Sequence, residues 1–225
     1  MQQPVQQKLT IAFLLLTITD LAGIITGFTP LHFFAKPLLI PVLMLLLFFT
    51  ASTVPGKKLL LAALFFSWMG DVFLLFEDRN KLFFIFGLAC FLTTHICYIV
   101  FFLRISSAER SLLLKQPVLL LLVPVYGLAL VWLLFPHLGD LKLPVIVYAT
   151  VICTMLLCSL HVFKKINSPA NRWYVLGASA FVLSDSLLAI NKFYQSFAFA
   201  GVSIMISYCA AQYCIVRGFM EQRNA

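Results

Sequence analysis

A few ionisable side chains lie inside long apolar runs of this sequence, where they could support chemistry. Asp71 lies near the end of one apolar run, and Asp185 lies near the end of another, 114 residues later. Two carboxyl groups that face each other in a low-dielectric site cannot both ionise easily, so one keeps its proton beside the negative charge of the other. Such a pair suits acid-catalysed cleavage through an oxocarbenium-like state, in which the acid protonates the substrate and the anion stabilises positive charge or activates water.

The same residues also have structural interpretations. Each aspartate could bond a neighbouring helix, or Lys36 could neutralise one of them. Asp20 has no motif around it and is interpreted as a helix contact or the rim of a cavity. Acyl transfer is not supported, because there is no Gly-x-Ser-x-Gly elbow and no histidine base is identified for Ser67 or Ser184.

Other polar side chains in the apolar runs are candidates to line a site. His95 lies near the middle of the fourth run with Tyr98 three residues later, and it serves either as an interhelical bond or as a ligand. Tyr208 and Gln212, four residues apart, form one polar stripe that suits either helix packing or a cavity wall. A zinc site needs three or four ligands, and the remaining histidines lie at other depths, so we expect neither a metal site nor a cofactor.

The composition requires a membrane. Of the 225 residues, 62% are hydrophobic and 11% are charged, whereas soluble domains are roughly half apolar and about a quarter charged. The net charge of +8 is spread in short basic pairs between apolar runs, which sets membrane orientation and excludes a nucleic-acid surface. All six cysteines fall inside apolar runs and are interpreted as small buried hydrophobes.

Apolar runs of nearly the length that spans a bilayer, about 20 helical residues, occur along the whole chain. They predict an all-α, multi-pass bundle of eight transmembrane helices in a single domain, 1–225, with the first helix retained rather than cleaved. The eight expected spans are Leu9–Phe28, Phe34–Ser52, Lys57–Phe76, Lys81–Leu103, Pro117–Phe135, Leu143–Phe163, Arg172–Ile190 and Phe197–Val216.

Lysine and arginine are distributed unequally between the two sets of span ends, eleven against four, which places both termini in the cytoplasm. Asp71 and Asp185 then each lie about five residues, or roughly 7–8 Å, from the external ends of their spans. Lys36 enters the second span from the same side, and Tyr148 occupies the external half of the sixth. These four residues are therefore expected to share one depth, just below the external headgroups.

Asp71 and Asp185 lie in similar short motifs four spans apart. A genuine repeat would relate the first four spans to the last four as parallel halves, a 4+4 arrangement, and chance similarity is the alternative. Parallel halves with buried carboxylates also describe proton-coupled carriers, so a proton-coupled transporter of small solutes is the alternative function.

Several segments together resemble the YhhN family, whose characterised members are lysoplasmalogenases. The resemblance covers about the last four-fifths of the chain and leaves out Asp20 and the first span. Its segments are Lys36-Pro37-Leu38, Gly70-Asp71-Val72-Phe73-Leu74, Phe86-Gly87-Leu88-Ala89-Cys90-Phe91 followed by His95 and Tyr98, Val147-Tyr148-Ala149, Phe181-Val182-Leu183-Ser184-Asp185-Ser186-Leu187-Leu188-Ala189 and Tyr208-Cys209-Ala210-Ala211-Gln212.

The resemblance implies an ether hydrolase that cleaves the vinyl ether of lysoplasmalogens into a fatty aldehyde and a glycerophosphoethanolamine or glycerophosphocholine. Asp71 and Asp185 would share the catalytic roles, and Lys36 and Tyr148 would bind phosphate or orient water. His95, Tyr98, Tyr208 and Gln212 would line the substrate cavity. The expected partners are a lysophospholipid substrate and the bilayer, with no nucleic acid.

A metal-dependent amidase of the alkaline-ceramidase type is a further alternative, weakened by the missing histidine set. The compact chain with short loops favours a bacterial inner membrane as the location.

Overall fold

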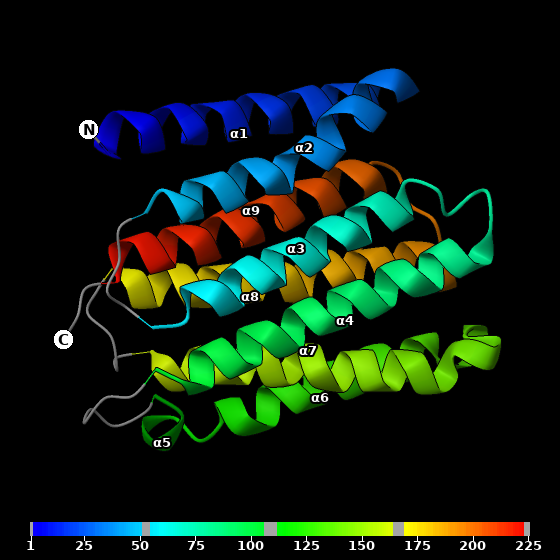
Figure 1. The fold of residues 1–225 in the computed structure, drawn as a ribbon. Helices are drawn as coiled ribbons and strands as arrows, with labels where there is room; N and C mark the ends of the chain where they lie inside the picture. The colour runs from blue at the N-terminus through cyan, green and yellow to red at the C-terminus, as the bar shows by residue number, and fades with distance from the viewer. Residues whose placement is uncertain (1, 51–54, 106–111, 164–168, 223–225) are drawn as a thin grey trace. The chain divides into compact units, whose positions relative to one another are not determined.

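Eight long α-helices make up most of the protein in a computed structural model that describes residues 2–50, 55–105, 112–163 and 169–222 (Figure 1). No strand occurs in these four ranges. The long helices are α1 (Gln2–Thr26), α2 (Thr29–Phe48), α3 (Lys57–Leu74), α4 (Lys81–Leu103), α6 (Leu119–Leu134), α7 (Lys142–Val162), α8 (Ala170–Ala189) and α9 (Ala200–Glu221).

Short helical turns join some of these helices. A four-residue helix, α5 (Leu112–Lys115), precedes α6, and the 3₁₀ turns η1 (Phe135–His137) and η2 (Gly139–Leu141) connect α6 to α7. Helix α8 continues into a π-helical turn, η3 (Ile190–Tyr194). The predicted all-α, eight-helix architecture is confirmed in the part of the chain that is described.

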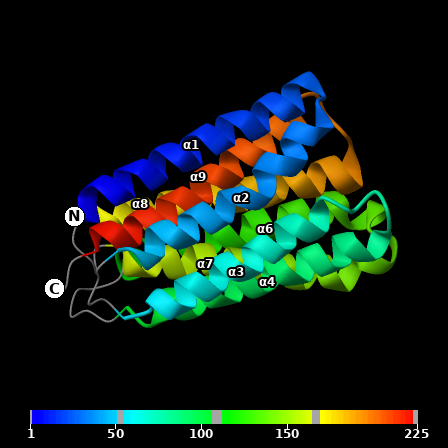
Figure 2. The same ribbon diagram turned by 45° about the horizontal axis from the view of Figure 1, so that its top comes forward.

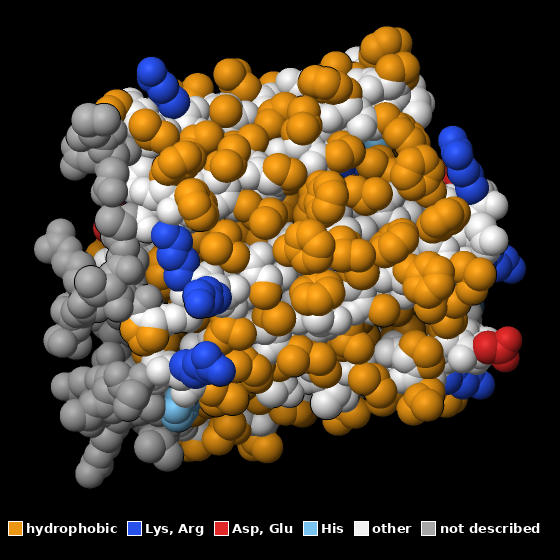
Figure 3. Space-filling model, in the orientation of Figure 1, with side chains coloured by type: hydrophobic (Ala, Val, Ile, Leu, Met, Phe, Trp, Pro, Cys, Tyr) orange, Lys and Arg blue, Asp and Glu red, His pale blue; other side chains and the backbone are white. Residues whose placement is uncertain are grey.

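Seven of the eight long helices are long and apolar enough to cross a membrane by length and composition. The remaining one, α3, has 18 residues and carries Lys57, Lys58 and Asp71. Large apolar side chains are exposed on the outside of the helices, for example Leu121 (68%), Leu128 (69%) and Trp132 (80%) on α6. Hydrophobic side chains cover most of the face drawn in Figure 3. Lipid is the solvent in which such a surface is stable, and the protein is therefore a multi-pass membrane protein.

The helix ends differ from the expected spans where polar residues continue or begin a helix. Helix α1 starts at Gln2 rather than Leu9, because its polar N-terminal residues extend the apolar span as helix. Helix α2 starts at Thr29 rather than Phe34, because Pro30 occupies the first turn, where its missing N–H costs no hydrogen bond. Four basic residues that enter the charge count lie outside the described residues: Arg110, Lys164, Lys165 and Arg223.

The helices group into two compact units. The first runs to Phe101 and contains α1 to α4, and the second starts at Phe102 and contains α5 to α9. The boundary falls in the last turn of α4, which ends at Leu103. The predicted 4+4 repeat and the cytoplasmic location of the termini remain predictions.

In the first unit, side-chain hydrogen bonds to backbone carbonyls join α2 to α3 and α3 to α4. Pro41 has no N–H, so the carbonyl of Pro37, four residues earlier in α2, cannot accept the usual helical hydrogen bond. The indole N–H of Trp68 in α3 donates to this carbonyl at 2.9 Å. The hydroxyl of Thr94 in α4 donates to the carbonyl of Ala63 in α3 at 3.1 Å.

Glycine allows close packing of α8 against α9 in the second unit, where Figures 1 and 2 both draw these helices side by side. A Cβ atom at Gly177 would lie 2.7 Å from the side chain of Ile215, and one at Gly218 would lie 2.7 Å from the ring of Tyr174. The Tyr174 hydroxyl donates to Gln222 at 2.7 Å. Small residues at crossing points are the usual means by which membrane helices approach closely.

Candidate active site

Asp185 on α8 accepts a short hydrogen bond from Tyr148 on the neighbouring helix α7. The distance from the tyrosine hydroxyl to Oδ2 of Asp185 is 2.6 Å. The sequence placed these two residues at one depth, and the fold of the second unit brings them into contact. Tyr148 lies near the start of α7 and Asp185 lies near the end of α8, and they can meet because these two adjacent helices are antiparallel.

A small cavity of about 50 Å³ surrounds this hydrogen bond between α6, α7 and α8. Apart from Asp185 and the two tyrosines Tyr126 and Tyr148, its walls are formed mainly by apolar side chains such as Leu130 and Ile152. A carboxyl group in such surroundings has little water to screen it, so the few polar groups around it determine its chemistry.

A second tyrosine reaches this cavity and was not identified from the sequence. The hydroxyl of Tyr126 on α6 donates to Oγ of Ser186 at 2.8 Å, and Ser186 donates in turn to the carbonyl of Val182 at 2.6 Å. Tyr126 is the one phenol in the otherwise apolar α6, and Ser186 directly follows Asp185. These two signals were available in the sequence.

Asp71 is buried in the first unit, with an exposed fraction of 2%. It follows Gly70 on α3, where an added Cβ atom would lie 2.7 Å from the ring of Phe91 on α4. A side chain at residue 70 would therefore require the Phe91 ring to move away from the turn that carries Asp71. Asp71 lies in one unit and Asp185 in the other, and their expected pairing remains a prediction.

The remaining predicted residues lie on three helices. Lys36 is half-buried on α2, while His95 and Tyr98 are fully buried on α4. On α9, Nε2 of Gln212 donates to the hydroxyl of Tyr208 at 3.3 Å. The Tyr208 ring contacts Phe181 of α8 edge to face, at 5.8 Å between centroids. The polar stripe of α9 thus faces α8, the helix that carries Asp185.

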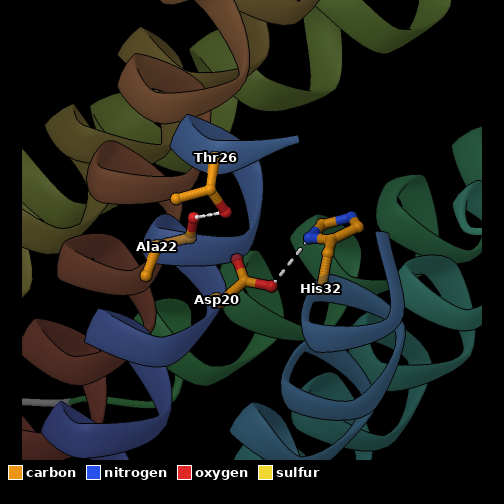
Figure 4. Close-up of polar contacts among 4 residues, drawn as sticks. All are labelled: Asp20, Ala22, Thr26 and His32. Atoms are coloured by element: carbon orange, nitrogen blue, oxygen red, sulfur yellow. Dashed lines mark hydrogen bonds and ion pairs between the residues drawn. The ribbon is translucent and has the colours of Figure 1, made fainter. Parts of the chain in front are cut away.

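Asp20 was interpreted as a helix contact or the rim of a cavity, and it makes a specific contact between two helices. Its Oδ1 lies 2.8 Å from Nδ1 of His32, which joins α1 to α2 (Figure 4). Asp20 is fully buried, and its Oδ2 has no hydrogen-bond partner among the described residues. A Cβ atom at Gly23 would lie 2.8 Å from the backbone nitrogen of His32. The missing side chain at Gly23 lets α2 approach closely enough for the pair to form.

Among the described residues, no group of three or more histidine, cysteine or acidic side chains is placed to hold a metal ion.

The fold and the site define a class of protein, an all-helical integral membrane protein that holds ionisable side chains within its apolar helices. Within that class, the chain belongs to the YhhN family, whose model matches residues 31–219. All of the predicted site residues lie within the matched range, whereas Asp20, which was not among them, lies outside it.

Related proteins are named as lysoplasmalogenases. The lysoplasmalogenase of Mycobacterium bovis is 35% identical over 148 residues, which is 63% of this chain and 52% of the relative. Lysoplasmalogenase TMEM86B is 34% identical in Sus scrofa over 178 residues and in Homo sapiens over 179 residues, in both cases 78% of this chain and 70% of the relative. The match spans about half the length of the mycobacterial relatives. No solved structure matches the chain.

Proposed function

We propose that this protein is a lysoplasmalogenase, a hydrolase of the vinyl ether in lysoplasmalogens. The observation that carries the proposal is the hydrogen bond from Tyr148 to Asp185 beside a cavity within the apolar helices. The names of the relatives support the same activity over the alternative of a proton-coupled transporter.

The proposed reaction needs proton transfer and water. Protonation of the β-carbon of the vinyl ether produces an oxocarbenium ion, and water then adds to the carbon that bears the oxygen. The resulting hemiacetal collapses to a fatty aldehyde and releases the glycerol hydroxyl of the glycerophospho-headgroup. A buried acid supplies the proton, and a nearby anion stabilises the positive charge of the intermediate.

The environments of the two aspartates favour different roles. Tyr148 donates to Asp185, and an oxygen that accepts a short hydrogen bond is suited to carry negative charge. We therefore assign charge stabilisation and water activation to Asp185, and proton donation to the more deeply buried Asp71. This assignment requires that the two units bring the aspartates to one cavity.

The remaining predicted residues receive supporting roles. Lys36 would bind the phosphate of the substrate, and Tyr148 would hold Asp185 in place and orient water. His95, Tyr98, Tyr208 and Gln212 would line the cavity. The substrate would be a lysophospholipid with an ethanolamine or choline headgroup, presented by the bilayer.

The proposal also covers the organisation of the chain and its location. Residues 1–225 would form one transmembrane domain, with both termini in the cytoplasm and a bacterial inner membrane around it. The alternative of a metal-dependent amidase predicts that a chelator stops turnover. A proton-transfer mechanism predicts that EDTA has no effect.

The test is aldehyde release by purified protein from a lysoplasmalogen and from its saturated alkyl-ether analogue. Only the vinyl ether should react, because an alkyl ether has no double bond to protonate. Asp71→Asn and Asp185→Asn should each lower kcat by about 100-fold or more, while both variants still insert and fold. The matched control is Asp140→Asn, a change at an exposed position in η2. Turnover close to wild type in either site variant would reject the assignment.

A further inference from the structure

An apolar groove lies between α6 and α7 in the second unit. Its volume is about 260 Å³, and its walls include Pro124 and Leu128 on α6 and Ile146 and Leu157 on α7. Ile146 and Leu157 stand eleven residues apart, so the groove follows α7 for about 16 Å at 1.5 Å per residue.

The groove adjoins the cavity that is lined by Tyr148 and Asp185. Four residues line both of them, namely Gly127, Val131, Ala149 and Cys153. Gly127 allows α6 and α7 to pack closely at this shared wall, since an added Cβ atom there would lie 2.7 Å from the sulfur of Cys153. The cavity that Asp185 lines and the apolar groove therefore share part of their walls.

The polar atoms along the groove are already engaged in hydrogen bonds within their own helices or the adjacent one. The hydroxyl of Thr150 donates to the carbonyl of Ile146 at 2.8 Å, and that of Thr154 donates to the carbonyl of Thr150 at 2.7 Å. The thiol of Cys153 donates to the carbonyl of Val123 at 3.8 Å. The threonines thus present their methyl groups, and the wall is suited to hydrocarbon rather than to water or a polar solute.

The direction of the groove matches that of a lipid chain. Tyr148 lies six residues, or about 9 Å, from Lys142 at the start of α7. From the level of Tyr148 the groove continues past Cys153 to Leu157, away from this end of the helix and through its middle. A lipid whose headgroup lay at the start of α7 would have its chain follow the same path.

We propose that this groove binds the alkenyl chain of the substrate, so that it selects for long single-chain lipids and delivers the vinyl ether to Asp185. The inference rests on the proposed function and adds the subsite that binds the hydrocarbon chain of the substrate. A lysolipid has one hydrocarbon chain, and the apolar groove adjoins the cavity lined by Tyr148 and Asp185. Bound bilayer lipid is the other occupant of such a groove, and the experiment separates the two.

The test is Thr154→Phe, which fills the groove at an exposed position one helical turn beyond Thr150. Thr154 lies six residues, or about 9 Å, beyond Tyr148. A hexadecenyl chain must pass it, whereas a hexenyl chain ends before it. The kcat/KM for hexadecenyl lysoplasmalogen should fall about tenfold or more, and that for the hexenyl substrate should stay close to wild type. The control Leu121→Phe adds an aromatic ring at a 68% exposed position on α6 outside the groove and should not change the ratio.

The outcomes separate the two proposals. If wild-type protein hydrolyses neither substrate, the proposed function fails. If it hydrolyses both and Thr154→Phe leaves the long-to-short ratio unchanged, the function stands and the groove holds bilayer lipid only, which overturns the inference. Should Thr154→Phe fail to fold, the smaller Thr154→Leu is expected to lower the same ratio by a smaller factor, and an unchanged ratio there also overturns it.

Discussion

At the scale of single residues, the contact between Tyr148 and Asp185 determines what the second unit can do. Its 2.6 Å distance falls within the range of about 2.5–2.7 Å for hydroxyl donors to an ionised oxygen. The phenol fixes Oδ2 of the carboxylate and thereby holds the orientation of the Asp185 side chain. Tyr126 and Ser186 form a second hydrogen bond in the same cavity, so this tyrosine provides a matched comparison.

The variant Tyr148→Phe should lower kcat/KM for lysoplasmalogen by about 10- to 100-fold, since a hydrogen bond to a charged group contributes about 1.5–3 kcal/mol. The effect should fall mainly on kcat, because the hydroxyl positions Asp185 rather than the lipid chain. Steady-state aldehyde release measures both constants. Tyr126→Phe, which breaks the bond to Ser186 instead, should lose less activity, and an equal loss in the two variants would contradict the special role of Tyr148.

At the scale of elements, the α1–α2 hairpin is held by a polar pair that the candidate active site does not use. Asp20 is fully buried, and His32 is its partner across the hairpin (Figure 4). A buried carboxyl group that loses its partner keeps its desolvation cost and has no compensating bond. The pair therefore fixes how α2 packs against α1, and α2 is the helix that carries Lys36.

The variant His32→Ala should lower the free energy of unfolding in detergent by about 3 kcal/mol, because it leaves the Asp20 carboxyl group buried and without this bond. The double variant Asp20→Asn with His32→Gln replaces the pair by two neutral amides that can bond each other, and it should recover most of the loss. Denaturant titration followed by circular dichroism measures both. A His32→Ala protein as stable as wild type would show that the pair contributes nothing to the hairpin.

At the scale of the whole molecule, the exposed apolar surface indicates the environment in which the protein is stable. Large apolar side chains on the helix exteriors (Figure 3) would aggregate in water, and lipid is the environment that accommodates them. In such an environment, the lysines and arginines at the helix ends determine the orientation. The sequence predicts eleven basic residues at one set of span ends and four at the other, with Lys36 inside a helix.

Single cysteines placed at Asn80 and at Gln222 in a cysteine-free variant should react differently with a membrane-impermeant maleimide. In intact cells Asn80 should label, because the turn before α4 is expected outside, whereas Gln222 should label only after the membrane is opened. Mass shift on a gel measures the labelling. Labelling of Gln222 in intact cells would reverse the predicted orientation and move the site to the cytoplasmic side.

Several features followed from the amino-acid pattern alone. Apolar runs of spanning length predict the eight helices, and α4 begins and ends at the predicted residues because Lys81 and Arg104 frame its apolar run. Helix ends were predicted less well where polar residues continue a helix, as at Gln2, or where proline begins one, as at Pro30. That Asp185 and Tyr148 lie at one level on α8 and α7 was also predictable, since each residue advances a helix by about 1.5 Å.

The sequence by itself determined which polar side chains lie within apolar helices and at what level along each helix, because helical rise and the cost of burying charge depend on the order of residues along the chain. The tertiary structure decided which of them meet. Asp185 is hydrogen-bonded to Tyr148, and Asp20 is hydrogen-bonded to His32. These contacts form because the rotation of each helix about its axis is set by packing at small residues such as Gly23. That rotation depends on contacts between distant parts of the chain, and no local pattern encodes it.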